Sequence, residues 1–552
     1  MKLKNILYSM MMGTAVLTGT TSCVSDLDQY PHKETTSKDV YTSLANYEAV
    51  LGKIYAAMVT SGQGKGGDNK DMESVLNNGS GFDYMRMFIN MQECGTDEFA
   101  STWLTGEQTT GLTYLSWDAN DAWVSDMYYR IYYNIALCNE FLRNANSASF
   151  SGADAEKMKE YKAEVRFMRA LFYFHALDLY RNIPMVTEND PVGSFIPPRY
   201  TPQQTFDYIE SELKDCVGDI LPAPTCPYGQ ASQGAAYTLL AKLYLNSEVY
   251  TGVAKYAECK EACKKVMDMG YSLESDYSKL FNADNDKRTN EIIFALPVSA
   301  EHTVSWGSST YLVCGQLSMS NANQTVADFG ATSGWSEFRL RPEFVDKFTQ
   351  TDIDGGGDKR CKFFTNGQSK DVTSMTDETT GYLSEKWSNL KDDGTTASNT
   401  ADAGVETDYP LFRLADVYLM YAECVARLGE DWDNWDGGSD AEAATRKEGA
   451  IYYINKVRER AYGDAEHNVW KDNFASDADF LQFILDERAR ELYHEGYRRT
   501  DLIRFGEFTT NKYIWQWKGG THDGQAVDSK YNIYPIPNTE LTANPNLHND
   551  NY

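Results

Sequence analysis

Three glutamates at four-residue intervals are the first candidates for chemistry in this sequence. Glu487, Glu491 and Glu495 lie in the stretch ERARELYHEGYRRTDLIRFG, among several arginines. Four-residue spacing places side chains on one face of a helix, so these carboxylates could bind a metal ion or supply a general acid and base. The same spacing also pairs Glu487 with Arg490 and Glu491 with Arg488. Since an adjacent arginine lowers a carboxyl pKa and weakens it as a general acid, the stretch is predicted to be structural.

Other catalytic and metal-binding patterns are weak. The sequence has no HExxH or GxSxG motif, and residues 61–70 are glycine-rich without the ending of a phosphate-binding loop. Two acidic loops are similar to calcium sites. Residues 352–358 lack the glutamate that closes an EF-hand, whereas residues 283–291 offer Asp286 as the better candidate ligand. No motif requires a cofactor, and a structural calcium ion at Asp286 is the one metal that we expect.

The N-terminus is predicted to be an export signal. Lys2 and Lys4 precede an apolar stretch over residues 6–17 and a run of small residues that ends at Cys23. We expect residues 1–22 to be removed and Cys23 to be acylated, which would make the chain a membrane-anchored lipoprotein. The alternative is ordinary secretion, with Cys23 incidental. No later apolar run is long enough to cross a bilayer.

The chain is acidic and rich in aromatic residues. Its 552 residues carry a formal charge of −29 and include 37 Tyr and 11 Trp. A charge of this sign repels phosphate backbones, so nucleic acid is not an expected partner. Aromatic side chains usually fill a core, but sugar-binding surfaces also use them.

Amphipathic helices that come in pairs dominate the pattern. Helical periodicity occurs over residues 39–60, 119–146, 153–181, 202–220, 231–250, 254–269, 411–429, 439–462 and 477–495. Within residues 235–270, the small Ala236 and Ala241 alternate with the larger Leu240 and Tyr244, as in tetratricopeptide-like helix hairpins. The sequence therefore predicts a mainly α fold with stacked helix hairpins as its scaffold.

Two long stretches interrupt the helices. Residues 62–118 and 274–400 are rich in Gly, Ser, Thr, Asn and Asp, with short β-type runs such as EIIFALPV and STYLVCG. Insertions on one face of a repeat scaffold often form its binding surface. We therefore expect a single domain over residues 23–552, in which these loop-rich insertions and short strands form a ligand face.

Five ordered blocks give the chain a resemblance to a known family. The opening stretch resembles the SusD/RagB family of outer-membrane nutrient-binding lipoproteins, and so do YPIPNTELTANPNLHNDNY, AEVRFMRALFYFHALDLYRNIPMV, GQASQGAAYTLLAKLYLNSEVYTG and PLFRLADVYLMYAEC. The resemblance implies a scaffold of about four tetratricopeptide-like units under a loop-rich ligand face. It also implies a role without catalysis: surface capture of glycans or peptides and their delivery to a SusC-type TonB-dependent transporter in the outer membrane.

Within that family, the chain is most similar to the starch-binding branch. The similarity lies in the stretches WGSSTYLVCG, ATSGW and TTNKYIWQWKGG, and around TDE and LTYLSW. That branch binds helical α-glucan on an arc of aromatic side chains, and the resemblance implies that Trp306 and Trp335 supply two of them. The third position is Ser101 in this sequence, so Trp103 is the expected substitute.

Polar groups complete the site that the resemblance implies. Arg86 aligns with an arginine of the branch's site, Asn78 stands where the branch has aspartate, and Gly106 stands where it has asparagine. Indole rings suit the apolar face of a sugar, and a guanidinium can donate two hydrogen bonds to adjacent hydroxyls. The expected glycan-binding residues are Trp306, Trp335, Arg86, Trp103 and Asn78.

The departures at Ser101, Gly106 and Asn78 leave the cargo open. Starch or another α-glucan is the expected ligand. The alternative within the same family is a protein that binds a β-glycan, a fructan or a peptide. Two alternatives of other classes also stay open. One is a secreted glycoside hydrolase, whose paired carboxylates are usually distant in sequence. The other is an interaction protein without a ligand, in which Trp306 and Trp335 would be buried.

Overall fold

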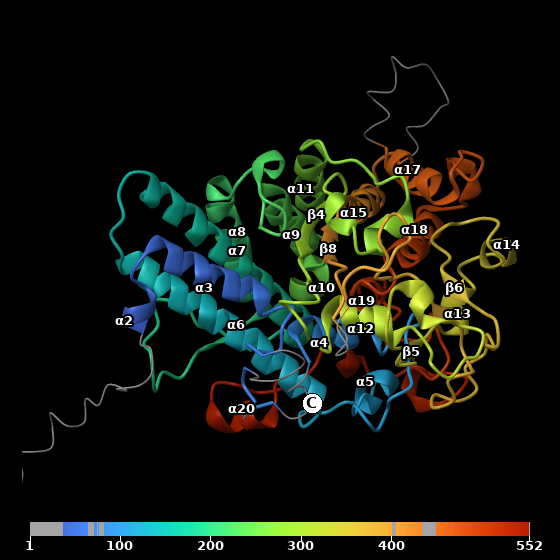
Figure 1. Cartoon of the computed structure of the whole chain (residues 1–552), viewed down its shortest axis with the longest axis horizontal. Helices are drawn as coiled ribbons and strands as arrows, with labels where there is room; N and C mark the ends of the chain where they lie inside the picture. Colours follow the sequence, from blue (N-terminus) through green and yellow to red (C-terminus); the bar gives the residue numbers. More distant parts are fainter. Residues whose placement is uncertain are drawn as a thin grey trace, which may run out of the picture. The chain divides into compact units, whose positions relative to one another are not determined.

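The computed structural model describes residues 37–64, 71–73, 75–76, 82–399, 404–432, 449–550 and 552 (Figure 1). The chain divides into two compact units, Met1–Val50 and Leu51–Tyr552. In the first unit, the described elements are helix α2 (Ser37–Val40) and the beginning of α3 (Leu44–Ala56). The second unit contains the helical scaffold and the residues of the candidate site.

Long helices that pack in sequence-adjacent pairs make up the scaffold. They are α6 (Ala122–Ser147), α7 (Ala153–Tyr180), α8 (Pro202–Cys216), α9 (Gln233–Leu245), α11 (Tyr256–Met267), α15 (Leu414–Arg427), α17 (Ala450–Tyr462) and α18 (Asp477–Leu492). Helix α6 packs on α7, α7 on α8, α9 on α11, and α15 on both α11 and α17 (Figure 1). The predicted mainly α fold is confirmed.

Side-chain caps explain why the helices begin near the predicted positions. Thr201 and Gln204 form a capping box at the start of α8, with Pro202 at its first position. The Asp121 side chain accepts a hydrogen bond from the Trp123 amide at the start of α6, and Ser232 caps α9 in the same way. Each cap satisfies an amide that the helix itself cannot, so these boundaries lie close to the ends of the periodic stretches.

Small buried residues bring α9 and α11 together. Ala236 and Ala241 of α9 are fully buried, and the Cys259 thiol of α11 donates to the Ala241 carbonyl at 3.2 Å. A thiol this close to a backbone carbonyl leaves no room for a larger side chain between the helices. The predicted hairpin in this region is therefore confirmed, with Cys259 packing as a small core residue.

The strands are short and form antiparallel pairs, most of them with at least one strand in a loop-rich stretch. Strand β4 (Ile292–Leu296) pairs with β8 (Tyr409–Arg413), so the prediction of a strand in EIIFALPV is confirmed. The other pairs are β1 (Ala100–Ser101) with β5 (Phe338–Arg339), β2 (Ile183–Pro184) with β3 (Arg199–Tyr200), and β6 (Phe363–Phe364) with β7 (Leu383–Ser384). Short helices in the loop-rich stretches include α5 (Thr110–Tyr114), α13 (Pro342–Val345) and α14 (Gln350–Ile353). Outside those stretches lie the short helices α10 (Ser247–Thr251), α19 (Arg498–Arg504) and α20 (Asn538–Ala543).

Two helices in these stretches differ from the predictions. The run STYLVCG belongs to helix α12 (Ser308–Gly315) and not to a strand, and helix α4 (Tyr84–Glu93) lies where only loop was expected. Every residue of both helices is buried. A helix without an exposed face has no amphipathic period, so the pattern cannot distinguish it from a strand or a loop. Helix α4 packs on α6, α12 and α19.

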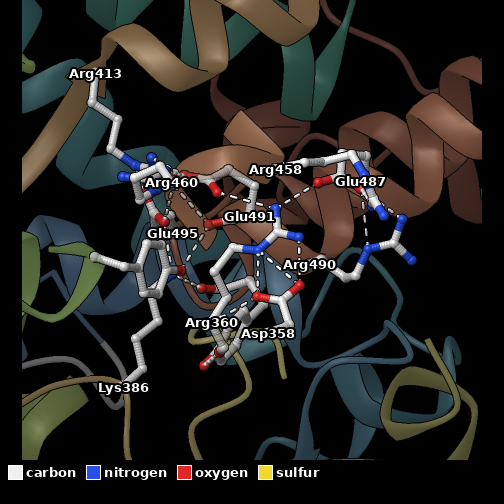
Figure 2. A network of polar contacts seen from close by, with 12 residues as sticks. Asp358, Arg360, Lys386, Arg413, Arg458, Arg460, Glu487, Arg490, Glu491 and Glu495 are labelled. Atoms are coloured by element: carbon white, nitrogen blue, oxygen red, sulfur yellow. Dashed lines mark hydrogen bonds and ion pairs between the residues drawn. The ribbon is translucent and has the colours of Figure 1, made fainter. Parts of the chain in front are cut away.

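The glutamates of the opening stretch are buried in a network of ion pairs (Figure 2). Glu491 lies 2.5 Å from both Arg413 and Arg460, and Glu487 lies 2.6 Å from Arg360. Burial alone would raise the pKa of Glu491, but the guanidinium groups of Arg460 and Arg413 lower it to about 2. A carboxylate held ionised in this way cannot act as a general acid, so the structural interpretation of the stretch is confirmed.

One predicted pair of that stretch is confirmed, whereas a second pair and the end of the helix differ from the predictions. The predicted pair between Glu487 and Arg490 forms at 2.7 Å. The predicted pair between Glu491 and Arg488 is wrong, because Arg488 instead binds Asp416 and Asp501. The helix that carries Glu491 ends at Leu492, before Glu495. Tertiary partners therefore replace the local pair at the buried end of α18.

The substitution Glu491→Gln should strongly destabilise the fold. It removes the carboxylate nearest to the buried Arg413 and Arg460, whose other shared partner is Glu291 at 3.2 Å and 3.3 Å. Breaking a buried ion pair costs about 3–5 kcal/mol. Glu140→Gln is a matched control, because Glu140 forms a half-exposed pair with Arg143 worth less than about 1 kcal/mol. Urea unfolding of the two variants measures both costs, and equal costs would contradict the structural role of the network.

Candidate functional site

Arg86 of helix α4 lies in a buried cluster beneath two tryptophans. Its Nη1 atom donates to the Trp306 carbonyl at 2.7 Å, and its Cζ atom lies 5.8 Å from the centre of the Trp335 ring. The guanidinium also lies against the rings of Phe82 and Tyr311, at 3.9 Å and 4.3 Å from their centres. Stacking of this kind holds a planar cation in one orientation.

Two acidic side chains bind this arginine. The Arg86 Nη2 atom donates to Glu107 at 2.5 Å and to Glu337 at 2.8 Å, and these three residues are called the Arg86 cluster. Burial, together with the neighbouring charge of Glu107, raises the pKa of Glu337 to about 8, although Arg86 opposes the rise. Tyr311 donates to the other oxygen of Glu337 at 3.1 Å. The buried guanidinium therefore binds both acidic side chains. At neutral pH, the raised pKa favours the protonated form of Glu337.

The rings of Trp306 and Trp335 form a half-buried pair. Their centroids are 6.1 Å apart and their planes are inclined by 53°. The Trp335 amide donates to the Cys314 carbonyl at 2.8 Å. Gly334 is required beside it, because a Cβ atom there would lie 2.7 Å from the Leu317 carbonyl oxygen. The backbone of Trp335 is thus fixed on the segment that follows α12.

Asp83 holds the segment that carries Trp306. One of its oxygens caps α4 by accepting from the Arg86 amide at 2.9 Å, and also accepts from the Ser308 amide at 3.1 Å. The other accepts from the Ser305 hydroxyl at 2.6 Å. Gly307 must lack a side chain, because a Cβ atom would lie 2.2 Å from the same carboxylate. The start of α4 therefore positions Trp306 through both Asp83 and Arg86.

Trp103 lies in the loop over residues 102–109, between β1 and α5, and is 38% exposed. The loop continues the pairing of β1 with β5, since the Thr102 amide donates to the Glu337 carbonyl at 2.7 Å. Ser101, in contrast, is fully buried and forms a hydrogen bond with the Thr109 hydroxyl. The exposed aromatic side chain of this segment is therefore Trp103, at the edge of the same strand pair that leads to Trp335.

Comparison with known proteins agrees with this architecture. A model of the SusD family matches residues 362–552, and a second model, described as starch-binding associating with outer membrane, matches residues 27–245. The starch-binding protein SusD of Bacteroides thetaiotaomicron is 32% identical, over 99% of both chains. The SusD-like protein P25 of Formosa agariphila is 25% identical, over 78% of each chain. The chain belongs to the SusD family.

Solved structures of this family share the fold. A SusD-like carbohydrate binding protein of Bacteroides fragilis superimposes with a TM-score of 0.70 at 18% identity, covering 92% of this chain and all of that one. Identity this low supports the fold alone. The resemblance to the SusD/RagB family is confirmed, and the comparisons indicate no enzyme family.

The structure brings three of the expected SusD-type site residues together. Arg86, Trp306 and Trp335 are in contact, and Trp103 is joined to them through its loop. The Arg86 side chain is enclosed, with Nη1 and Nη2 both bound to protein oxygens. Asn78 lies outside the described residues. The export signal and Cys23 also lie outside them.

The expected calcium ligand stands apart from this cluster. Asp286 is exposed in a short 3-10 turn, η6 (Asn285–Lys287). Its neighbour Asp284 pairs with Lys287 at 2.8 Å and accepts from the Asp392 amide. Within the described parts of the chain, no group of three or more His, Cys, Asp or Glu side chains is arranged to hold a metal ion. In those same parts, no helix has the length and apolar character of a membrane span.

Sequence reasoning missed Asp83, Glu107 and Glu337. Glu337 is 251 residues from its partner Arg86, and 80 acidic residues in the chain offer many equivalent candidates. One signal is present: Glu337 stands two residues after Trp335 and is the one charged residue between Phe329 and Phe338. An isolated acidic residue beside an expected binding aromatic is a reason to look for a buried cation.

The raised pKa of Glu337 should make stability depend on pH. Glu337 keeps its proton up to about pH 8 in the folded state but loses it near pH 4.5 when unfolded, so its contribution is present below pH 4.5 and lost by pH 8. Glu337→Gln removes this loss. The variant should therefore gain stability relative to the parent by on the order of 3 kcal/mol between pH 5 and pH 8.

Chemical denaturation of both proteins at several pH values measures this difference. Glu156→Gln is the control, because Glu156 is exposed at the start of α7 and should give a pH-independent difference. The same pH-independent behaviour in Glu337→Gln would show that Glu337 is ionised throughout.

Proposed function

We propose that the chain is a cell-surface glycan-binding protein that captures an oligosaccharide or polysaccharide on Trp306, Trp335 and Trp103. The observation that carries this proposal is the inclined pair of half-buried indole rings, 6.1 Å apart, held from below by a buried ion cluster. The apolar face of a sugar ring packs on an indole and buries area at little cost in side-chain entropy. Binding then needs stacking and hydrogen bonds, without covalent chemistry or a cofactor.

The inclination of the rings favours a curved glycan. Two platforms at 53° follow a ligand that bends between successive sugars, as an α-glucan helix does. A flat β-linked ribbon would favour coplanar rings. The relative named starch-binding protein SusD, 32% identical over nearly the whole chain, supports the same choice. The proposed ligand is therefore starch or a related α-glucan.

The proposed place of action is the outer membrane. The family description, starch-binding associating with outer membrane, supports this location, and the sequence at Cys23 supports a lipid anchor on the cell surface. The proposed partner is a SusC-type TonB-dependent transporter, which would receive the captured glycan. The formal charge of −29 argues against a nucleic-acid partner.

Removal of either ring should weaken glycan binding. Trp306→Ala and Trp335→Ala should each lower the association constant for maltoheptaose by about ten-fold or more, because each loses one stacking surface. Isothermal titration of the mature protein measures this. Trp470→Ala is the control for the loss of an indole outside the proposed site. Trp470 is 38% exposed and lies at the η8 turn (Lys471–Asn473).

The ligand panel separates the alternatives. β-Cyclodextrin should give heat of binding, as maltoheptaose should, whereas a fructan, a β-glucan and a xylan should give none. If the fructan, the β-glucan or the xylan gives heat and the α-glucans do not, the protein binds a glycan but its ligand is not starch. New reducing ends after incubation with α-glucan would instead identify a glycoside hydrolase. Absence of binding to every glycan would contradict the proposal.

The lipid anchor can be tested separately. Cys23→Ser removes the only thiol next to the predicted cleavage site, so the variant should move from the membrane fraction to the soluble fraction when it is expressed in a bacterium that processes lipoproteins. The other cysteines serve as controls: Cys361→Ser should stay with the membrane. Membrane retention of Cys23→Ser would exclude acylation at this residue.

A further inference from the structure

The three tryptophans of the proposed site come from different segments of the chain. Trp306 precedes α12, Trp335 follows it before β5, and Trp103 lies in the loop over residues 102–109. Backbone hydrogen bonds join these segments two at a time: the Thr102 amide donates to the Glu337 carbonyl at 2.7 Å, and the Trp335 amide donates to the Cys314 carbonyl at 2.8 Å. A group that contacts all three segments at once adds to these pairwise bonds.

Arg86 makes one such contact with each segment. Nη1 binds the carbonyl of Trp306 itself, and Nη2 binds Glu337, two residues beyond Trp335. The same Nη2 binds the carboxylate of Glu107, in the loop of Trp103. Because the guanidinium is planar and rigid, these contacts fix the three segments relative to one another.

We infer that Glu107 is a positioning residue: its carboxylate, bound to Arg86, holds the loop of Trp103 against the Trp306–Trp335 pair. This inference rests on the proposed glycan binding at these tryptophans. Glu107 acts through Arg86 and Trp103 rather than by touching sugar, because the side chain is buried beneath the loop. Arg86 takes the same supporting part, with its Nη atoms already bound to protein oxygens.

Other contacts of the loop lead to its own ends or to other parts of the fold: Leu104 packs against Val372 and Met375, and its carbonyl accepts from the Thr110 hydroxyl at 3.0 Å. The Glu107 amide bonds back to the Trp103 carbonyl within the loop, at 3.1 Å, and this closes the turn without attaching it to anything else. The Trp123 indole donates to the Glu107 carbonyl at 2.7 Å. The tip, at Thr105 and Gly106, is exposed. Through Arg86, the carboxylate of Glu107 thus links the loop to both other tryptophan segments, in addition to the backbone bond from the Thr102 amide to the Glu337 carbonyl.

A loop ordered before the ligand arrives gives tighter binding. Ordering a side chain or a loop on binding lowers affinity, whereas a preorganised platform avoids that cost. With Glu107 in place, the indole of Trp103 is presented at a fixed distance from the two other rings. The Arg86 cluster therefore sets the geometry of the platform, which determines the curvature of glycan that fits.

The test compares Glu107→Ala with Glu107→Gln in the full mature chain. The glutamine keeps an oxygen that can accept from Arg86, and Glu337, relieved of the charge of Glu107, can then ionise beside Arg86. The alanine removes the oxygen. We expect Glu107→Ala to weaken maltoheptaose binding by about ten-fold and Glu107→Gln to stay within about two-fold of the parent. The exposed Glu156→Gln is the matched control and should bind as the parent does. Cooperative thermal unfolding confirms that each variant is folded.

A second measurement reports on the rings without sugar. Near-ultraviolet circular dichroism senses the packing of indoles, and acrylamide quenching senses their exposure. Both should change in Glu107→Ala and not in Glu107→Gln. In a Trp103→Phe background, the change in quenching caused by Glu107→Ala should largely disappear, because the tryptophan that moves is then absent.

Two outcomes would overturn the inference. The first is a folded Glu107→Ala that binds maltoheptaose as the parent does. The second is weaker binding with unchanged dichroism and quenching, which would make Glu107 a direct sugar contact. If the parent itself binds no glycan, the proposed function fails, and the dichroism and quenching of the alanine variant alone decide whether Glu107 positions the loop.

Discussion

The structure depends on how its buried charged side chains are paired away from water. Arginine cannot give up its proton inside a protein, so each buried guanidinium needs carboxylates or carbonyls within hydrogen-bond distance. Arg413 has Glu291, Glu491 and Glu495, and Arg86 has Glu107 and Glu337. In both clusters the partners come from distant parts of the sequence. Satisfying the cation therefore also fixes how separate segments meet.

The network around α18 joins the loop-rich insertion to the scaffold. Arg360 and Lys386 belong to the insertion over residues 274–400, and their side chains reach Glu487 and Glu495 at 2.6 Å. Figure 2 shows these side chains converging on the glutamates of the opening stretch. A mobile insertion could not present a stacking platform. The scaffold glutamates would thus support the proposed ligand binding indirectly, by fixing the insertion that carries Trp306 and Trp335.

The sequence predicted those parts of the fold that have a periodic exposed side. The long helices from α6 to α11 follow from apolar spacing and caps, whereas α4 and α12 do not, because their residues are buried all round. In the candidate site, family resemblance named Trp306 and Trp335, whose rings lie 6.1 Å apart in the structure. The partners of Arg86 required the tertiary fold, since one chain segment alone gives no sign of which carboxylate meets which arginine.

The proposed third aromatic is Trp103 and not a ring at position 101, and this difference changes which contacts hold the ring. In a continuing strand, residues two apart face the same side, yet Ser101 is buried and Trp103 is exposed. Strand β1 ends at Ser101, so the loop that follows re-aims Trp103 outward. A ring at position 101 would take its direction from the strand pair. The direction of a ring at position 103 depends on the conformation of the loop. In our proposal that conformation depends on the buried carboxylate of Glu107, which binds Arg86.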